Sequence, residues 1–319
     1  MPGSAEEGSR PEVSSETPRY NEFGFFADNA SEYGIAYDGP PTVRRASVEM
    51  ADGREMSALV WGSAAPEVVL IHGGAQNAHT WDTVALALDR PLVAIDMPGH
   101  GHSDAPADSA TNIDRNAQDV AAMIEALAPG VQTIVGMSLG GLITMSMSAQ
   151  YSDLFSTMFL VDMTPGVTRN KAKSIHDFVN GPESFPNFDE LLARTLEFNP
   201  TRTESSLRRG ILHNAEQRED GSWVWRHARH RVFRSPSSEM ADNTPNYDAL
   251  WDAIENHGGP VVLARGMREQ SVVDDADETE LLRRRPDARV EHFHEAGHSI
   301  QGDMPVELAA LIGEVLDES

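Results

Sequence analysis

The stretch VQTIVGMSLGG, residues 131–141, joins an apolar run to a glycine-rich end that holds one serine, Ser138. The apolar run is typical of a strand buried on both faces of a parallel sheet, and the residues after it predict the start of a helix. Residues 136–140 fit the pattern G-x-S-x-G, in which a sharp strand-to-helix turn exposes a serine nucleophile. Because the pattern also fits a small polar residue in a glycine-rich loop, its surroundings in the chain decide between the two.

Predicted strands and helices alternate on both sides of this stretch. Residues 42–50 and 55–62 alternate in hydrophobicity and are joined at Asp52-Gly53, a pair typical of a β-hairpin. Further strands are predicted at 67–74, 91–101, 131–137, 156–166, 259–266 and 288–298, and helices at 79–89, 112–129, 141–155, 276–286 and 305–318. Strands that alternate with helices indicate parallel βαβ units, here after an opening antiparallel hairpin, so the predicted fold class is α/β.

The alternation stops at one long insertion. Residues 167–256 contain helical pieces, such as 188–198, but no predicted buried strand. We therefore expect an α/β core formed by 41–166 and 257–319, with a helical domain inserted at 167–256. Residues 1–40 form an N-terminal segment with ten charges, eight of them acidic, and its first half is predicted to be disordered. The second half of the segment contains an aromatic cluster at 21–37, so the alternative that it packs against the rest of the protein stays open.

The composition limits the classes of partner. The formal net charge is -25 over 319 residues, which repels nucleic acid and anionic membranes, so neither is expected as a partner. The chain has no cysteine, which excludes disulfides, a thiolate nucleophile and cysteine metal sites. The sequence contains no run of 18 apolar residues, so no membrane span is predicted, and the N-terminus lacks the pattern of a secretory signal. The default expectation is a cytoplasmic location.

Four blocks of sequence carry a resemblance to a known family. IHGGAQNAHTWD (71–82), IDMPGHGHSD (95–104), VGMSLGG (135–141) and EAGHSIQGD (295–303) are similar to those of the α/β-hydrolase superfamily, in its serine hydrolase and esterase branch, and they occur in that family's order. The resemblance implies a mostly parallel eight-stranded sheet with a helical cap after the sixth strand, where the insertion falls. It also implies that Ser138 is the nucleophile.

The resemblance assigns the catalytic base to His298, just after the last predicted strand. A serine hydroxyl is a poor nucleophile until a neighbouring imidazole takes its proton, which explains why the chemistry needs a histidine there. The chain has 12 histidines, so most of them are structural. His292 and His294 are predicted to be packing or surface residues, and His100 and His102 to be structural.

The position of the catalytic acid is less obvious. Family members commonly carry it a little under thirty residues before the histidine, and 28 residues before His298 the chain has Gln270, which cannot act as a carboxylate. Other members place the acid at the end of the sixth strand, which here ends in Asp162, 24 residues after Ser138. A buried aspartate needs a partner, and an imidazole N–H would supply one. We predict Asp162 as the acid and leave open Glu269 and the pair Asp274 and Asp275.

The remaining predicted site residues concern the oxyanion and the substrate. By resemblance, the backbone N–H groups of Gly74 and Leu139 form the oxyanion hole, while His72 orders the loop that contains Gly74. The segment SWVWRHARHRVFR (222–234) is basic and aromatic in an acidic chain. One hypothesis is that Arg226 and Arg229 bind a carboxylate on a monoester substrate. The alternative, which we favour, is that the arginines of this segment dock the cap on the acidic core.

The function predicted from the sequence is hydrolysis of a carboxylic ester through an acyl-enzyme, with an otherwise hydrophobic small-molecule substrate. Haloalkane dehalogenases and epoxide hydrolases share the architecture but need an aspartate where Ser138 stands. No H-E-x-x-H, Walker or dinucleotide-binding pattern occurs, and no metal or cofactor is implied. Perhydrolase-type haloperoxidases and C–C bond hydrolases stay open as alternatives. A non-catalytic small-molecule receptor of the same fold is the alternative from another class.

Overall fold

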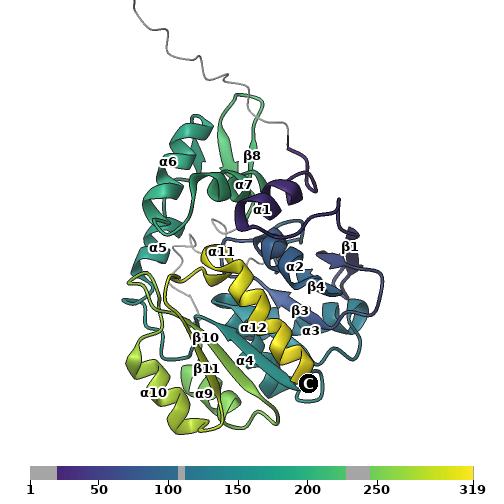
Figure 1. Ribbon diagram of the computed structural model, residues 1–319, viewed down its shortest axis with the longest axis vertical. Coiled ribbons are helices and arrows are strands. Elements are labelled where there is room, and N and C mark those ends of the chain that lie inside the picture. Colours follow the sequence, from purple (N-terminus) through teal and green to yellow (C-terminus); the bar gives the residue numbers. More distant parts are fainter. Residues whose placement is uncertain (1–19, 107–111, 228–244, 319) are drawn as a thin grey trace, which may run out of the picture.

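The computed structural model describes residues 20–106, 112–227 and 245–318, and its centre is one eight-stranded sheet (Figure 1). In sheet order the strands are β1 (Val43–Glu49), β2 (Glu55–Trp61), β4 (Leu92–Ile95), β3 (Val68–Ile71), β5 (Thr133–Met137), β6 (Thr157–Val161), β10 (Val261–Gly266) and β11 (Arg289–Phe293). β1 pairs with β2 and β2 with β4 in antiparallel register, whereas the other pairs are parallel. The predicted α/β class, hairpin and eight-stranded sheet are confirmed.

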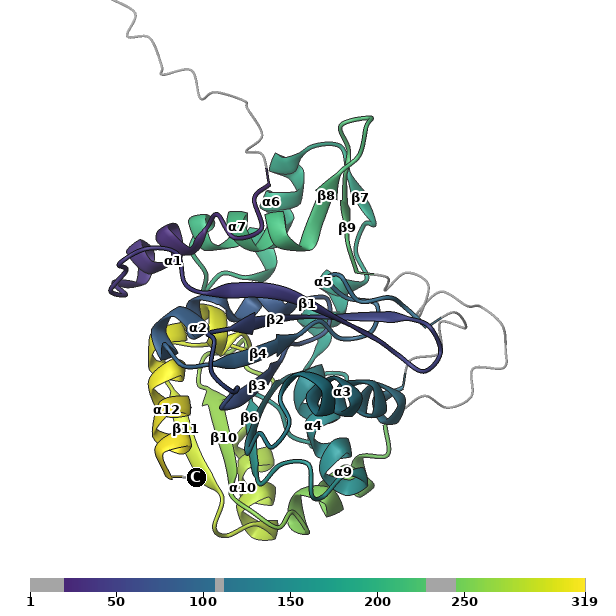
Figure 2. The ribbon, with the colours of Figure 1, turned by 90° about the vertical axis from the view of Figure 1, so that its right-hand side faces the viewer.

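The central strands are buried along their whole length, as their uninterrupted apolar sequences predict. One face of the sheet is covered by α3 (Ile113–Leu127), α4 (Leu139–Gln150), α9 (Tyr247–Glu255) and α10 (Asp275–Arg284). The other face is covered by α2 (Asp82–Leu88), α12 (Pro305–Glu318) and the N-terminal α1 (Phe26–Tyr33). The two layers are visible on either side of the sheet in Figure 2. Both layers pack to nearly complete burial, so the sheet is a rigid support for the loops at its edge.

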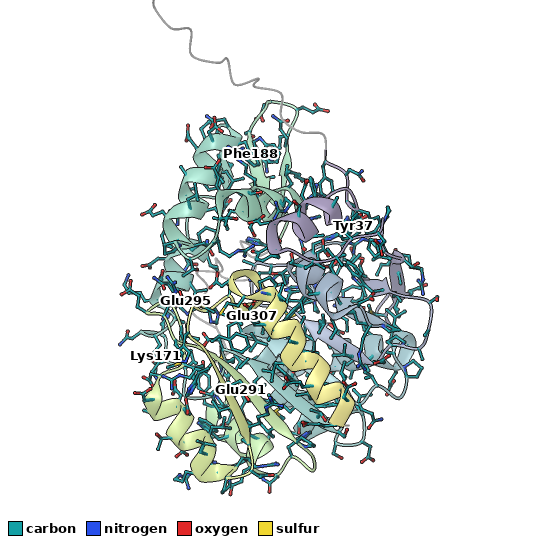
Figure 3. All side chains as sticks on the ribbon, in the orientation of Figure 1. Tyr37, Lys171, Phe188, Glu291, Glu295 and Glu307 are labelled. Carbon is teal, nitrogen blue, oxygen red and sulfur yellow. The ribbon has the colours of Figure 1, made fainter. Side chains whose placement is uncertain are left out.

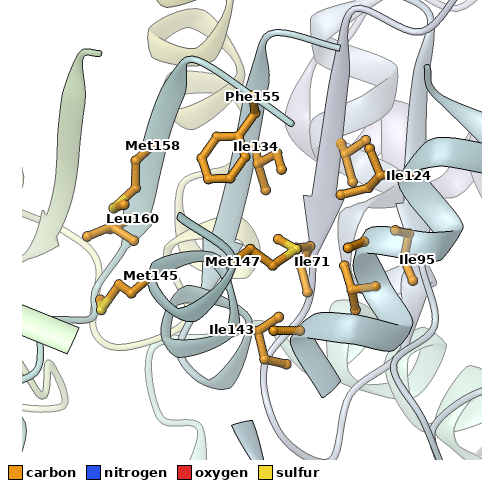
Figure 4. Packing of buried hydrophobic residues seen from close by; sticks show 14 of the residues in the cluster. Ile71, Ile95, Ile124, Ile134, Ile143, Met145, Met147, Phe155, Met158 and Leu160 are labelled. Carbon is orange, nitrogen blue, oxygen red and sulfur yellow. The ribbon is translucent and has the colours of Figure 1, made fainter. Parts of the chain in front are cut away.

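The packing between α4 and the sheet is formed mostly by isoleucine and methionine (Figure 4). Ile143 and Met147 of α4 meet Ile71 and Ile134 of the sheet in one buried cluster. Methionine is flexible and fills irregular gaps, which suits a helix whose other residues are small. This packing fixes the start of α4, and therefore the turn before it, relative to the strand ends.

The inserted region carries its own small core above the carboxyl edge of the main sheet (Figure 1). It contains α5 (Lys173–Val179), α6 (Phe188–Phe198) and α7 (Glu204–Asn214). It also contains an antiparallel sheet in the order β7 (Ser184–Phe185), β9 (Trp223–Trp225), β8 (Ala215–Gln217), which the sequence did not predict. Strands of two or three residues are too short to show an alternating pattern. We refer to residues 167–227 of this region as the cap.

Helix α9 forms the last part of the predicted insertion 167–256. It packs against α4, and its residues Leu250, Trp251 and Ile254 belong to the core cluster rather than to the cap. An amphipathic pattern predicts a helix but does not say which surface the helix covers. By its packing, α9 is therefore part of the layer that covers the sheet.

The described part of the N-terminal segment packs on the core. Phe26 of α1 is buried, with its ring 5.0 Å from that of Trp61, and Glu22 forms an ion pair with Arg45 of β1. The expectation of disorder falls on residues outside the described ranges. The acidic excess is at the surface, where side chains such as Glu295 and Glu307 are exposed (Figure 3). Within the described ranges, no helix combines the length and the hydropathy that crossing a membrane requires.

Candidate active site

Ser138 stands on a strained turn between β5 and α4. Its φ of 52° and ψ of −116° lie in a region that residues with a side chain rarely adopt, at a cost of about 1–3 kcal/mol. A Cβ on Gly140 would stand 2.3 Å from the carbonyl oxygen of Ile71, and a Cβ on Gly136 would stand 2.5 Å from that of Gly140. Both flanking positions therefore require glycine, because the turn brings α4 against the backbone of the neighbouring strand.

Asp162 follows β6, the strand beside β5, and its carboxylate is fully buried. Oδ1 accepts hydrogen bonds from Gly266 N at 3.0 Å and from the Ser271 hydroxyl at 2.6 Å. Oδ2 accepts from Val272 N at 3.0 Å and lies 2.9 Å from His298 Nδ1. Four partners satisfy a carboxylate that would otherwise be costly to bury.

His298 comes from the loop after β11 and lies over the same edge of the sheet. Because Nδ1 faces the carboxylate of Asp162, it carries the proton, and Nε2 keeps the lone pair that a general base uses. Among the described residues no hydrogen bond joins Ser138 to His298, and the backbone N–H of Ser138 donates to Val161 O at 3.3 Å. Hydrogen bonds of this kind often tighten only when substrate is bound. The structure thus brings together the predicted triad residues Ser138, Asp162 and His298 at the ends of adjacent elements.

The other acid candidates are engaged elsewhere. Glu269 is exposed and accepts a hydrogen bond from Gln270. Asp274 caps helix α10 and pairs with Lys171 at 2.8 Å, and Asp275 forms an ion pair with Arg265 at 2.7 Å. None of these three contacts His298 in the part of the chain that the structure describes.

The loop at the usual position of the acid has a different task in this chain. Residues 266–272 supply the three donors that hold Asp162: two backbone N–H groups and the hydroxyl of Ser271. Ser271 was not among the predicted site residues, because a single serine in a loop has no sequence pattern that indicates its partner.

The predicted oxyanion hole lies between the loop after β3 and the start of α4. A Cβ on Gly73 would stand 3.2 Å from Ser138 Cβ, so this loop touches the nucleophile turn. The N–H groups of Gly74 and Leu139 donate to no acceptor among the described residues. Two free N–H groups beside a helix N-terminus favour a developing negative charge.

Two histidines, His72 and His100, contact the backbone of this loop. His72 Nε2 accepts from Met97 N at 3.1 Å while Nδ1 lies 2.7 Å from Gly73 O, so the ring is neutral with its proton on Nδ1. Burial, and to a lesser extent the nearby ring of His100, lower the pKa of His72 to about 3. His100 Nε2 accepts from Ala75 N at 3.2 Å, and Ala75 has a φ of 63°. The histidine contacts stabilise this strained backbone beside Gly74.

The other predicted structural histidines lie away from the triad. His292 Nε2 is 2.8 Å from a carboxylate oxygen of Glu278, and its ring makes an edge contact with that of His294. The side chain of His102 is partly exposed, 4.0 Å from Asp96. These positions are consistent with surface and packing roles.

A cleft of about 130 Å³, open to solvent, lies between the cap and the core. At the core side it is lined by Ala75 and Gln76, which follow Gly74, and by Gln301 of the short helix α11 (Ile300–Asp303). At the cap side its lining includes Arg202 and Arg209. The cleft therefore lies between the loop that follows Gly74 and two arginines of the cap.

The predicted substrate-binding Arg226 does not line this cleft. Its guanidinium pairs with Glu216 at 3.0 Å, donates to Ala215 O at 3.1 Å and lies over the ring of Tyr20. These contacts tie β9 to β8 and to the N-terminal segment. Glu216 belongs to the cap, so this ion pair does not dock the cap on the core. Arg229 lies outside the described residues.

One cluster between core and cap has the chemistry of metal ligands. Among the described residues, His79, Asp82 and His213 bring one ligand atom each within 4.8 Å of one another. The two imidazole rings stack with centroids 3.9 Å apart and planes 12° from parallel. Lone pairs in parallel ring planes cannot converge on one ion unless a ring rotates. In this arrangement the cluster instead joins η1 (Ala78–Trp81) and α2 of the core to α7 of the cap.

Comparisons with known proteins agree with this geometry. A family model described as alpha/beta hydrolase fold matches residues 66–305. The esterase Rv0045c of Mycobacterium tuberculosis is 37% identical over 304 residues, which cover 93% of this chain and 96% of that protein. Its crystal structure has a TM-score of 0.78 and 36% identity, covering 95% of this chain and all of that one.

A second enzyme shares the fold at lower identity. The crystal structure of an E-2-(acetamidomethylene)succinate hydrolase has a TM-score of 0.73 and 24% identity, covering 86% of this chain and 99% of that one. At this identity the likeness concerns the fold alone. Together with the family match and the similarity to an esterase over most of its length, the sheet order shows that this chain belongs to the α/β-hydrolase fold family, as a hydrolase of carboxylic esters.

Proposed function

We propose that this esterase works through an acyl-enzyme formed on Ser138, with His298 as general base and acid and Asp162 as the acid of the triad. The observation that carries the proposal is the 2.9 Å contact between His298 Nδ1 and Asp162 Oδ2, one strand away from a serine on a strained turn. The sequence order Ser, Asp, His also agrees with the motif found around the serine.

The reaction follows from these positions. The hydroxyl oxygen of Ser138 attacks the ester carbonyl carbon while His298 Nε2 takes the hydroxyl proton. The oxyanion accepts hydrogen bonds from the N–H groups of Gly74 and Leu139. His298 then gives its proton to the leaving alcohol, and the acyl group stays on Ser138. A water molecule, deprotonated by His298, attacks this acyl-enzyme, and collapse of the second oxyanion releases the acid and restores the serine hydroxyl.

Asp162 has an electrostatic and orienting role. Its carboxylate accepts a hydrogen bond from Nδ1–H of His298, keeps the ring in the tautomer with a free Nε2 lone pair, and stabilises the imidazolium that forms. Its remaining hydrogen bonds from Gly266, Ser271 and Val272 hold the carboxylate in place during the reaction.

The substrate that we propose is an ester with a polar group rather than a purely hydrophobic one. The cleft next to the oxyanion loop is lined largely by amides, hydroxyls and arginines, which favour polar ligands. A carboxylate-bearing ester fits this lining, because two arginines are part of it. A cytoplasmic location stays a prediction of the sequence.

The proposal is tested by turnover and by labelling. We expect wild-type protein to hydrolyse short 4-nitrophenyl esters and to react with a fluorophosphonate, and mass spectrometry should locate the adduct on Ser138. Protein that is folded by circular dichroism but neither turns over an ester nor is labelled would contradict the mechanism. Peroxide-dependent halogenation without ester hydrolysis would favour the perhydrolase alternative.

A further inference from the structure

Two arginines of the cap line the same cleft, in a chain whose net charge is -25. Arg209, on α7, is fully engaged. Its Nε donates to Asn29 Oδ1 at 2.6 Å, Nη1 donates to Ser205 Oγ at 2.6 Å, and Nη2 pairs with Glu32. This guanidinium links the cap to α1 of the N-terminal segment. Because it already forms an ion pair with Glu32, it is not available to bind an anionic ligand.

Arg202, just before α7, has a different environment. Of its five N–H donors, only one on Nη2 has an acceptor among the described residues, the hydroxyl of Ser206. Nε is buried and has no hydrogen-bond partner, and no described carboxylate forms an ion pair with the guanidinium. A partly buried cation without a counterion is costly, so an unfilled guanidinium facing a cleft indicates a place for an anion.

The nearest carboxylate does not fill this place. Asp303 is close enough to feel the charge of Arg202, but its Oδ2 accepts from Gly297 N at 2.8 Å and its Oδ1 from the Thr201 hydroxyl at 2.9 Å. Both carboxylate oxygens of Asp303 are therefore used in hydrogen bonds, one of them to the loop that carries His298. Among the described residues Asp303 forms no hydrogen bond or ion pair with Arg202.

A glycine in the core makes room for the guanidinium. A Cβ on Gly302 of α11 would stand 2.3 Å from Nη1 and 2.6 Å from Cζ of Arg202. The guanidinium therefore lies directly against α11, the helix that begins two residues after His298. This contact brings a positive charge from the cap to the wall of the cleft that is continuous with the catalytic loop.

On the core side the cleft borders the loop that contains the predicted oxyanion donor Gly74. Gln76 lines the cleft, and its Oε1 accepts from Gly73 N at 3.0 Å. A Cβ on Gly73 would stand 3.2 Å from Ser138 Cβ, so an ester held at Ser138 lies next to this wall of the cleft and would extend its other end toward Arg202. We propose that Arg202 binds a carboxylate carried by the ester substrate and makes the enzyme prefer monoesters of dicarboxylic acids over uncharged esters.

This inference rests on the proposed function and adds the residue that selects the substrate. Guanidinium and carboxylate form charge-assisted, often bidentate hydrogen bonds, and removing one such contact changes binding by about 10- to 100-fold. Lysine would keep the charge but lose the fork of donors.

The experiment compares two esters of equal shape. Monoethyl glutarate carries the carboxylate, and ethyl glutaramate replaces it with an uncharged amide. We expect wild-type protein to have the higher kcat/KM for monoethyl glutarate. In R202Q the ratio of the two kcat/KM values should fall by about 10- to 100-fold, and R202K should lie between. The matched control is R208Q, an exposed arginine on α7 that pairs with Glu204 and does not line the cleft, and it should keep the wild-type ratio.

A second measurement is independent of turnover. Glutarate should raise the Tm of wild-type protein and of R208Q in a concentration-dependent way, but not that of R202Q, with circular dichroism confirming that all three are folded. If the wild type hydrolyses ethyl glutaramate at least as well as the monoester and glutarate gives no shift, the carboxylate site is refuted while the esterase reaction stands. If no ester is hydrolysed, the proposed function fails, and the glutarate shift alone supports or refutes the anion site.

Discussion

The triad region and the cleft under the cap differ in how completely their polar groups are satisfied. Asp162 has four hydrogen-bond partners around a fully buried carboxylate, whereas Arg202 uses one of its donors. The first arrangement fixes a group that must not move while charge develops on His298. The second arrangement leaves N–H donors of Arg202 unused, and in our proposal the substrate's carboxylate accepts from them. The fully hydrogen-bonded carboxylate thus belongs to the proposed triad, and the guanidinium with unused donors to the proposed binding site.

Removing the nucleophile should have the largest effect. We expect S138A to lower kcat for a 4-nitrophenyl ester by about 10⁴- to 10⁶-fold, because no other side chain can form the acyl-enzyme. The turn should relax rather than unfold, since alanine is also strained at a φ of 52° but no larger than serine. Steady-state rates and intact-mass labelling measure this. Labelling of S138A at another serine would move the nucleophile away from the β5–α4 turn.

Removing the charge of Asp162 should come next. In D162N the amide can donate to His298 Nδ1 and favour the wrong tautomer, so we expect kcat to fall by about 10³- to 10⁴-fold with little change in KM. E269Q is the matched control at the usual position of the acid and should retain wild-type rates. Near-full activity of D162N would show that another group orients His298.

The sequence predicted the triad region better than the cleft, for a physical reason. The nucleophile turn and the strand end at Asp162 lie within apolar strands, whose burial in a parallel sheet forces their carboxyl ends to meet. The cleft depends instead on which arginine of the cap turns inward. Arg202 does so because Gly302, one hundred residues later, leaves space for it, and Arg226 does not because Glu216 is close by on β8. Such contacts between distant segments have no local pattern.

The same distinction applies to two features of the inserted region. The strands β7, β8 and β9 of the cap are stabilised by packing around Trp223 and Phe185 rather than by a periodic sequence. The amphipathic pattern of helix α9 suits a helix that covers the core or one that belongs to the cap. Only the position of Trp251 in the core cluster shows that α9 covers the core.

A smaller effect is expected from the loop that supports the acid. S271A removes the 2.6 Å hydrogen bond to Asp162 but leaves both backbone donors, so kcat should fall about tenfold while KM stays the same. S271T keeps the hydroxyl and should restore most of the rate. A general structural defect would instead lower the Tm of both variants and would not be relieved by threonine. Equal rates for S271A and wild type would show that the backbone donors alone hold Asp162.

The smallest effect concerns the docking of the cap and depends on pH. Burial opposes a charge on His79, but the Asp82 carboxylate and hydrogen bonds to Asp82 and Glu22 outweigh it and raise the pKa to about 9. Since this pKa exceeds the usual 6.5, the folded protein holds the proton more tightly than the unfolded chain. The stabilisation is fully present below pH 6.5 and is lost as the pH rises through about 9. The Tm difference between wild type and H79Q, measured from pH 6 to 10, should therefore shrink by a few degrees toward high pH. A difference that grows with pH would mean that His79 stacks on His213 as a neutral ring, and that the core and the cap are joined without a buried charge.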